Sequence, residues 1–231
     1  MTVERLNEML GDEHRSTLTE VESKEFLAAA GIAVVETRLA RDRGEAAATG
    51  RSIGFPVALK ICSPQIVHKS DCGGVKLGLN TPGGIQEAYD GIMEAVRRHH
   101  PQAVIHGVAV QKMAPPGIET IIGVSKDPHF GHVIMFGLGG VFVEVLKDVT
   151  FRIIPVTPKD AHEMITEIKG YPVLCGYRGR DPVNLNALAD MICKVSALVG
   201  NDPRISELDL NPVFAGVDGA VVGDARIALA G

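Results

Sequence analysis

The feature that most restricts the fold is a series of strand-like segments in the second half of the chain with no helical segment between them. These segments are "IETIIGVSKD", "HVIMFGLGG", "VFVEVLKD" and "FRIIPV". Short connections of this kind join antiparallel neighbours, whereas parallel neighbours need a long crossover. Two helical patterns follow, and the chain closes with two more strand-like runs. The order predicts an α+β fold on antiparallel sheets and disfavours a doubly wound parallel sheet.

The first half of the chain predicts a smaller α+β lobe of its own. Thr19 and Glu22 have the spacing of a helix-opening capping box, and Gly31 follows where that helix would stop. The clearest helix is "GGIQEAYDGIMEAVRRHH", whose apolar residues recur every three to four positions. The stretch "APPG" after residue 113 is a plausible hinge. We therefore expect two lobes, residues 1–109 with the N-terminal helix and residues 110–231.

Composition excludes several classes of partner and site. The formal net charge of −5 argues against nucleic acid or an anionic membrane as the main partner. No apolar run approaches the roughly 20 residues of a membrane helix, and the polar, acidic start is neither a signal nor a transit peptide. The 4 cysteines form no CxxC pair, so zinc and a disulfide framework are disfavoured and a reducing cytoplasm is expected.

The closing hairpin carries candidate metal ligands. Asp218-Gly219 between two apolar runs predicts a two-residue turn, which would place Val213 opposite Asp224. Because strand side chains alternate, Asp209, Asn211 and Val213 would share a face, with Asp224 on that face diagonal to Asn211. Three oxygen-bearing side chains on one face suit Mg²⁺ held together with nucleotide phosphates. A solvated polar face would have the same pattern.

Two lysines in strand-like runs are candidate phosphate contacts. Lys60 ends the apolar run "PVALK", and a lysine there needs a partner because lysine is rarely buried alone. A phosphate would serve, and so would a carboxylate, which is commoner. Lys76 in "GGVKLGL" could be a second phosphate contact or an exposed residue of an alternating strand. The chain has no GxxxxGK[ST] loop, and "GLGG" at 137–140 does not complete a dinucleotide fingerprint.

His68 stands in an unusual setting, the connection "SPQIVHKSDCGG" between two strand-like runs. An imidazole nitrogen can attack a phosphoryl group and hold it covalently. Glycines would let the segment move, and the neighbouring Lys69 would stabilise the anion. A single loop histidine is more often simply exposed, so the residues alone support only a nucleotide and Mg²⁺ site between two lobes.

Three stretches together resemble a known family. "FPVALKICSPQIVHKSDCGGVKLGL", "IETIIGVSKDPHFGHVIMFGLGG" and "SELDLNPVF" are similar to the ATP-grasp β subunit of ADP-forming acetyl-CoA (acyl-CoA) synthetases, relatives of the succinyl-CoA synthetase β subunit. The similarity runs from about residue 18 to the end. It implies the ATP-grasp fold, in which two α+β lobes with antiparallel sheets clamp ATP or ADP.

The resemblance implies roles for residues that match the family's motifs. It implies phosphate contacts for Lys60 and Lys76, the adenine pocket for Gln111 and Met113, and the ribose for Glu119.

The resemblance also implies the metal ligands and the catalytic residue. Asn211 and Asp224 match the Mg²⁺ ligands, while Asp209 stands where the related synthetase has a longer glutamate. His68 matches a histidine proposed to receive a phosphoryl group on a mobile segment.

The implied reaction needs a second polypeptide. An acyl-CoA thioester and phosphate give an acyl phosphate, and its phosphoryl group passes to a phosphohistidine on the partner subunit. From there it travels to the β subunit and on to ADP. This chain has no glycine fingerprint of the kind expected for CoA binding. The resemblance therefore implies a CoA-binding α subunit, in an α₂β₂ assembly.

Two other functions remain open from the sequence: a stand-alone ATP-grasp carboxylate ligase that works through an acyl phosphate, and a non-catalytic nucleotide-binding module. The sequence leaves open the acyl substrate, the physiological direction, the choice between ADP and GDP, and whether the chain is a separate subunit or part of a fused one. Glu144, Arg152 and Arg178 could contact phosphate or a partner, with nothing to decide between them.

Overall fold

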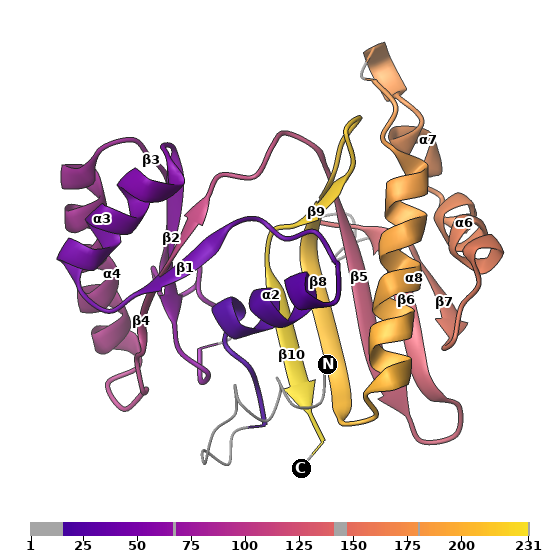
Figure 1. The fold of residues 1–231 in the computed structure, drawn as a ribbon, viewed down its shortest axis with the longest axis horizontal. Coiled ribbons are helices and arrows are strands. Elements are labelled where there is room, and N and C mark those ends of the chain that lie inside the picture. Colours follow the sequence, from indigo (N-terminus) through magenta and orange to yellow (C-terminus); the bar gives the residue numbers. More distant parts are fainter. Residues whose placement is uncertain (1–15, 67, 141–146, 180, 231) are drawn as a thin grey trace. The chain divides into compact units, whose positions relative to one another are not determined.

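The computed structural model describes residues 16–66, 68–140, 147–179 and 181–230 (Figure 1). The chain divides into two compact units. The first contains the described residues up to Leu18, Ser23–Val34 and the chain from Ala114 onward, and the second contains Thr19–Glu22 and Val35–Met113. The units differ from the expected ranges 1–109 and 110–231, because most of the N-terminal helix belongs with the C-terminal part of the chain.

The first unit is built on one antiparallel sheet. Its strands are β5 (Ile118–Asp127), β6 (Gly131–Leu138), β7 (Val149–Ile153), β8 (Ile205–Ala215), β9 (Ala220–Val222) and β10 (Ala225–Leu229). The order across the sheet is β10-β8-β5-β6-β7, with β9 paired to β8. The predicted antiparallel arrangement is confirmed. The expected strand over 141–148 lies mostly outside the described residues.

Helices cover one face of this sheet. They are α6 (Pro158–Glu167), α7 (Tyr171–Leu174) and α8 (Leu185–Asn201), with the 3₁₀ helix η1 (Tyr177–Gly179) between the last two. Figure 1 shows α6 and α8 lying along the sheet, and both contact β6. Ile122, Ile134 and Phe136 are fully buried in the core below them. Because α8 has hydrophobic residues around most of its surface, eight of its residues are buried.

Helix α2 (Glu20–Ala29) explains where the unit boundary falls. The capping box predicted from the sequence is confirmed, since the Glu22 amide donates to Thr19 Oγ1 at 3.3 Å and the Thr19 amide to Glu22 Oε2 at 2.7 Å. Phe26 and Leu27, farther along the helix, are completely buried in the core of the first unit. Burial of these two large side chains ties the later part of α2 to the C-terminal sheet.

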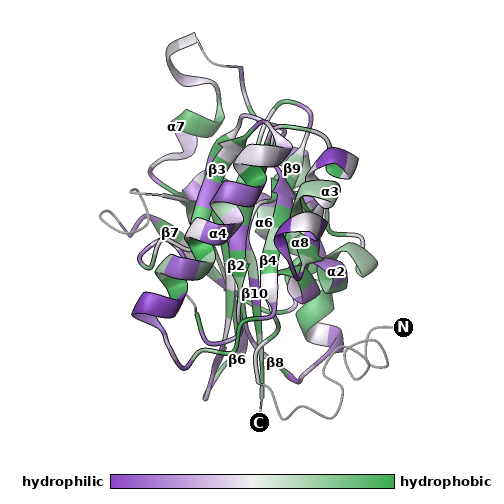
Figure 2. Ribbon diagram, turned by 90° about the vertical axis from the view of Figure 1, so that its left-hand side faces the viewer, coloured by the Kyte–Doolittle hydropathy of each residue, from purple (hydrophilic) through white to green (hydrophobic). Residues whose placement is uncertain are grey.

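The second unit has a four-stranded antiparallel sheet. Its strands are β1 (Thr37–Ala40), β2 (Val57–Cys62), β3 (Val75–Leu79) and β4 (Gly107–Lys112), in the order β1-β4-β2-β3. Helices α3 (Arg43–Ile53) and α4 (Pro82–His99) pack on Val57, Leu59 and Ile61 of β2. Helix α4 combines hydrophilic and hydrophobic residues, as its two colours show (Figure 2), and Ile85, Ile92 and Val96 are its fully buried contacts.

The other face of this smaller sheet carries the buried Lys60 beside apolar residues. Lys60 and Cys62 alternate with the buried Leu59 and Ile61, so they point away from α3 and α4. The first turn of α2 packs there, where Val21 meets Cys62 and Ala109. Among the described residues, no helix combines the length and apolarity needed to cross a membrane.

Candidate nucleotide and phosphoryl-transfer site

The closing hairpin forms where the sequence predicts, but in a different register. Val213 pairs with Val222 and Ala215 with Ala220, so the prediction of Val213 opposite Asp224 is wrong. A two-residue type I′ turn needs positive φ at both central residues, and Asp218 does not adopt it. The strands instead close with a bond from the Gly216 amide to the Gly219 carbonyl at 2.8 Å, which gives a longer loop.

Asp209 and Asn211 share an exposed face of β8, as predicted, but Val213 does not. The pairing of β5 with β8 shifts between Thr120 and Ile122, where β8 carries one extra residue. This bulge reverses the alternation, and Val213 is fully buried in the core. The interpretation that placed Val213 beside the two polar residues is therefore wrong.

Asp224 approaches the same acidic group from the connection between β9 and β10. Its Oδ1 accepts the Ala225 amide at 2.9 Å. Although Asp209 keeps an exposed surface, partial desolvation followed by the negative charge of Asp224 raises the pKa of its carboxyl. Asp209, Asn211 and Asp224 each carry oxygen donors of the kind that Mg²⁺ prefers.

Arg226 is a neighbour of this group that sequence reasoning missed. It lies directly across from Asp209 in the pairing of β10 with β8, and its charge opposes the rise in the Asp209 pKa. Within the described part of the chain its Nε is buried without a hydrogen-bond partner. The alternating pattern "DARIAL" could have identified it, since Arg226 interrupts an otherwise apolar strand.

His68 lies in the connection between β2 and β3, and it is exposed. Buried side chains hold the connection on both sides of His68, namely Ile66 before it and Cys72 after it. The Gly74 amide donates to the Lys69 carbonyl at 2.8 Å, and a side chain at Gly74 would approach that oxygen within 2.8 Å. Gly73 has a φ of +70°. The two glycines thus allow a tight turn that leaves His68 at the surface.

Lys60 has a carboxylate partner. Its Nζ donates to Glu20 Oε1 at 2.7 Å, and Lys69 Nζ donates to Glu20 Oε2 at 2.7 Å. Of the two partners left open by the sequence, the structure shows the carboxylate. Glu20 was missed because it lies 40 residues away in the chain, in the first turn of a helix, where an acidic residue is ordinarily explained by the helix dipole.

The two lysines predicted to contact phosphate lie on different faces of the smaller sheet. Lys60 pairs with Val75 and Leu59 with Lys76, so the register assigns the two lysines to opposite faces of this strand pair. Lys76 is exposed. Gln111 is buried on β4, and the Met113 amide donates to the Pro56 carbonyl at 3.2 Å.

Glu119 lies on β5 of the first unit and explains the glycines of "GLGG". The Gly139 amide donates to the Glu119 carbonyl at 2.8 Å. A Cβ at Gly139 would come within 3.2 Å of the Glu119 backbone, and one at Gly140 within 3.2 Å of its carboxylate. The glycines therefore allow the chain to approach Glu119 closely. Glu119 itself is exposed.

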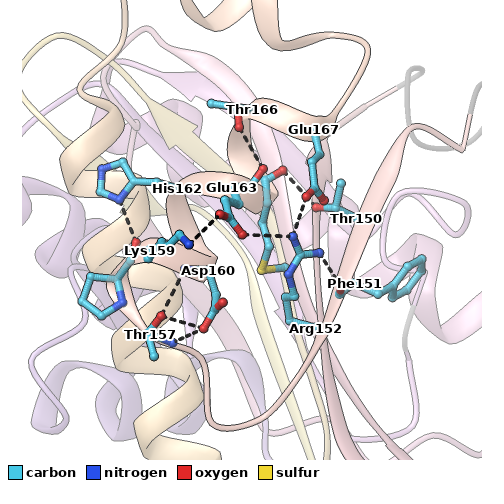
Figure 3. Close-up of polar contacts among 12 residues, drawn as sticks. Thr150, Phe151, Arg152, Thr157, Lys159, Asp160, His162, Glu163, Thr166 and Glu167 are labelled. Carbon is cyan, nitrogen blue, oxygen red and sulfur yellow. Dashed lines mark hydrogen bonds and ion pairs between the residues drawn. The ribbon is translucent and has the colours of Figure 1, made fainter.

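Arg152 is engaged in an ion-pair network rather than presented to a ligand. Figure 3 shows its guanidinium between two glutamates of α6, with Glu167 at 2.6 Å and Glu163 at 3.9 Å. The hydrogen bond to Glu167 raises the pKa of Arg152. Arg178 falls in η1, and Glu144 lies outside the described residues.

Cys62, beside Lys60 on β2, is not a plausible nucleophile. Burial raises the pKa of its thiol to about 11, so the reactive thiolate is scarce at neutral pH. The four cysteines are free. No group of three or more His, Cys, Asp or Glu side chains is placed to hold a metal among the described residues, so the predicted site rests on two carboxylates and an amide.

Comparison with known proteins gives consistent matches along the chain. A family model described as an ATP-grasp domain matches residues 10–229. The β subunit of acetate–CoA ligase (ADP-forming) II from Pyrococcus furiosus is 52% identical over 94% of this chain and 93% of its own length.

Solved structures of the acetyl-coenzyme A synthetase 1 of Ca. Korarchaeum cryptofilum match equally fully. One holds coenzyme A and Mg-AMPPCP with its phosphohistidine segment pointing towards the nucleotide site, at 43% identity, TM-score 0.87 and 100% of both chains. Another holds coenzyme A and acetyl-coenzyme A with a phosphorylated segment in the site I orientation, at 44% identity, TM-score 0.90 and 100% of both chains.

Proposed function

This chain belongs to the ATP-grasp family, and on that premise we propose that it is the nucleotide-binding β subunit of an ADP-forming acyl-CoA synthetase. The observation that carries the proposal is the match of subunit to subunit, since the Pyrococcus furiosus relative is covered over 93% of its length at 52% identity. We propose acetyl-CoA as the thioester, because these relatives are named for acetate or acetyl-coenzyme A.

The proposed chemistry passes a phosphoryl group through His68. A partner-bound acyl-CoA and inorganic phosphate give an acyl phosphate and free CoA. A histidine nitrogen of the partner subunit then forms a P–N bond as the P–O bond to the acyl group breaks and the carboxylate leaves. A nitrogen of the His68 imidazole next takes over the phosphoryl group, forming a new P–N bond as the partner's P–N bond breaks. In the last step an oxygen of the ADP β-phosphate attacks, the P–N bond breaks, and ATP and neutral imidazole remain.

The geometry of the β2–β3 connection supports this role for His68. Its side chain is exposed between the buried Ile66 and Cys72, so it can meet a reacting group without unfolding the sheet. The Korarchaeum cryptofilum structures include two orientations of a phosphohistidine segment. We propose that residues 68–73, called the His68 segment below, form the corresponding segment here.

We propose as nucleotide contacts Lys60 and Lys76 at phosphates, Gln111 and Met113 at the adenine, and Glu119 at the ribose. Lys60 would share its charge with Glu20, so we expect Lys76 to be the more available of the two lysines. Asp209, Asn211 and Asp224 would hold Mg²⁺, which when bound neutralises charge on the nucleotide phosphates. The related synthetase was solved with Mg-AMPPCP.

The proposed partner is a CoA-binding α subunit, and the proposed assembly is α₂β₂. Two relatives from Pyrococcus furiosus are themselves β subunits, and the chain's net charge of −5 gives no support for nucleic acid as a partner. A cytoplasmic location is part of the proposal, because four free cysteines suit a reducing compartment.

Reconstitution tests the proposal. The chain is purified alone and together with its co-expressed CoA-binding subunit, and ATP formation from acetyl-CoA, ADP and phosphate is measured with Mg²⁺. We expect turnover only in the two-subunit sample. ATP-dependent ligation by the chain alone would support a stand-alone ligase, and nucleotide binding without turnover in the complex would support a non-catalytic module; either result contradicts the proposal.

A further inference from the structure

A buried carboxylate connects the His68 segment to the sheet of its unit. The Glu20 side chain is 2% exposed, and its two oxygens accept from Lys60 and Lys69 at 2.7 Å each. All three residues belong to the second unit, so the arrangement is internal to it. The lysine side chains are 10% and 16% exposed, which places both ion pairs largely out of water.

The two lysines differ in where they are attached. Lys60 lies in the middle of the unit, on β2, which is paired on both sides. Lys69 is the residue after His68 and lies in the turn between β2 and β3. Its carbonyl accepts the Gly74 amide and, at 3.3 Å, the Cys72 thiol. One partner of Glu20 therefore belongs to a fixed strand, and the other belongs to the proposed mobile segment.

We propose that Glu20 is a positioning residue that fixes the docked position of the His68 segment through Lys69. Because Lys69 is bonded to His68 in the chain, any large movement of His68 must separate Lys69 from Glu20. The role in the relay rests on the proposed function, whereas the attachment itself does not.

Because Glu20 also pairs with Lys60, the attachment of the segment through Lys69 can be reversible. Separating a buried ion pair is costly when it leaves an uncompensated charge. When Lys69 leaves, Glu20 still has Lys60 at 2.7 Å, so the buried carboxylate stays paired. Lys60 thus acts as the permanent partner of Glu20 and Lys69 as the exchangeable one. This arrangement holds the segment in place and also permits its departure.

Amide hydrogen exchange of the full chain tests the division of roles between the lysines. The amides of Gly73 and Gly74 report on the segment, and those of β4 report on the sheet. In Lys69→Met we expect the segment amides to exchange about tenfold faster while β4 stays within about twofold of wild type. In Lys60→Met we expect the amides of β4 to show the larger increase in exchange rate.

Conservative and combined variants separate positioning from general packing. Lys69→Arg keeps the cation, so it should restore slow exchange of the segment. Glu20→Gln should loosen the segment as Lys69→Met does, and combining the two should accelerate the segment amides no further, because both remove the ion pair between Glu20 and Lys69. Glu20→Gln should also accelerate the β4 amides, since it removes the pair with Lys60 as well. Arg51→Met, which removes an exposed cation of the same unit, should change neither region.

Three results would overturn the proposal: segment amides unchanged in Lys69→Met, equal acceleration of segment and sheet in that variant, or no restoration by Lys69→Arg. The exchange experiment involves no phosphoryl transfer. If His68 were never phosphorylated while the exchange pattern held, the proposed function would fail and the attachment by Glu20 would stand.

Discussion

The two candidate regions handle charge in opposite ways. In the second unit, the lysines near His68 are matched by Glu20 inside the protein, through two bonds of 2.7 Å. In the first unit, desolvation and, after it, the negative charge of Asp224 raise the pKa of the Asp209 carboxyl. The region around His68 in the second unit is stabilised by its own counter-charges, whereas the acidic region in the first unit would be stabilised by an added cation. The difference suggests that the His68 region is built to position a segment and the acidic region to bind Mg²⁺.

The largest expected effect lies on the His68 side. His68→Ala should lower turnover of the two-subunit complex by about 10³-fold or more, as expected when a covalent nucleophile is removed, with nucleotide affinity nearly unchanged. Steady-state ATP formation and calorimetric nucleotide binding measure the two quantities. His129→Ala, an exposed histidine in the β5–β6 turn, is the control. Full turnover in His68→Ala would show that the phosphoryl group does not pass through His68.

Stability should distinguish a buried ion pair from an exposed one within the same unit. Glu20→Ala should lower the free energy of unfolding by about 3–5 kcal/mol, because it removes the shared partner of two largely buried lysines. Glu36→Ala, whose pair with Arg38 is about half exposed, should cost about 0–1 kcal/mol. Urea unfolding measures both. Equal costs would show that Glu20 is not the centre of the region.

On the acidic side, Asp224→Asn should weaken binding of Mg-AMPPCP to the two-subunit complex by about 10–100-fold, the range for loss of an important group at a metal site. Asp218→Asn, in the exposed loop of the same hairpin, should leave affinity unchanged. Titration calorimetry with and without Mg²⁺ separates metal from nucleotide. The same affinity in both variants would exclude Asp224 as a ligand.

The smallest expected effect is a pH dependence away from both regions. Two hydrogen bonds from Arg204, at 2.9 and 2.7 Å, lower the pKa of the buried Asp202. This interaction therefore stabilises the fold above the unfolded pKa of about 3.9 and is lost as pH falls through the lower folded value. Asp202→Asn should lower the free energy of unfolding by about 1–2 kcal/mol at pH 7 and make it fall less steeply as the pH is lowered. A free energy of unfolding that falls with pH as steeply as in wild type would contradict this. Asp190→Asn, at an exposed carboxylate, is the control.

The sequence predicted the antiparallel α+β architecture because strand runs, glycines and caps are local signals. Thr19 and Glu22 form the expected capping box, and Asp209 and Asn211 share a face. The register of the hairpin could not be predicted, because it depends on the φ of Asp218 and on a bulge in β8 that only the pairing with β5 reveals. Nor could Glu20 be linked to Lys60, since that contact is set by packing and not by any local pattern.

The central claim is that His68 carries the phosphoryl group, and trapping that intermediate tests it most directly. The two-subunit complex is incubated with Mg-ATP and quenched in base, and the peptides around His68 are analysed by mass spectrometry. We predict one phosphoryl group on His68, labile in acid, discharged by added ADP and absent from His68→Ala. A complex that makes ATP from acetyl-CoA, ADP and phosphate without any phosphoryl group on His68 would contradict the account.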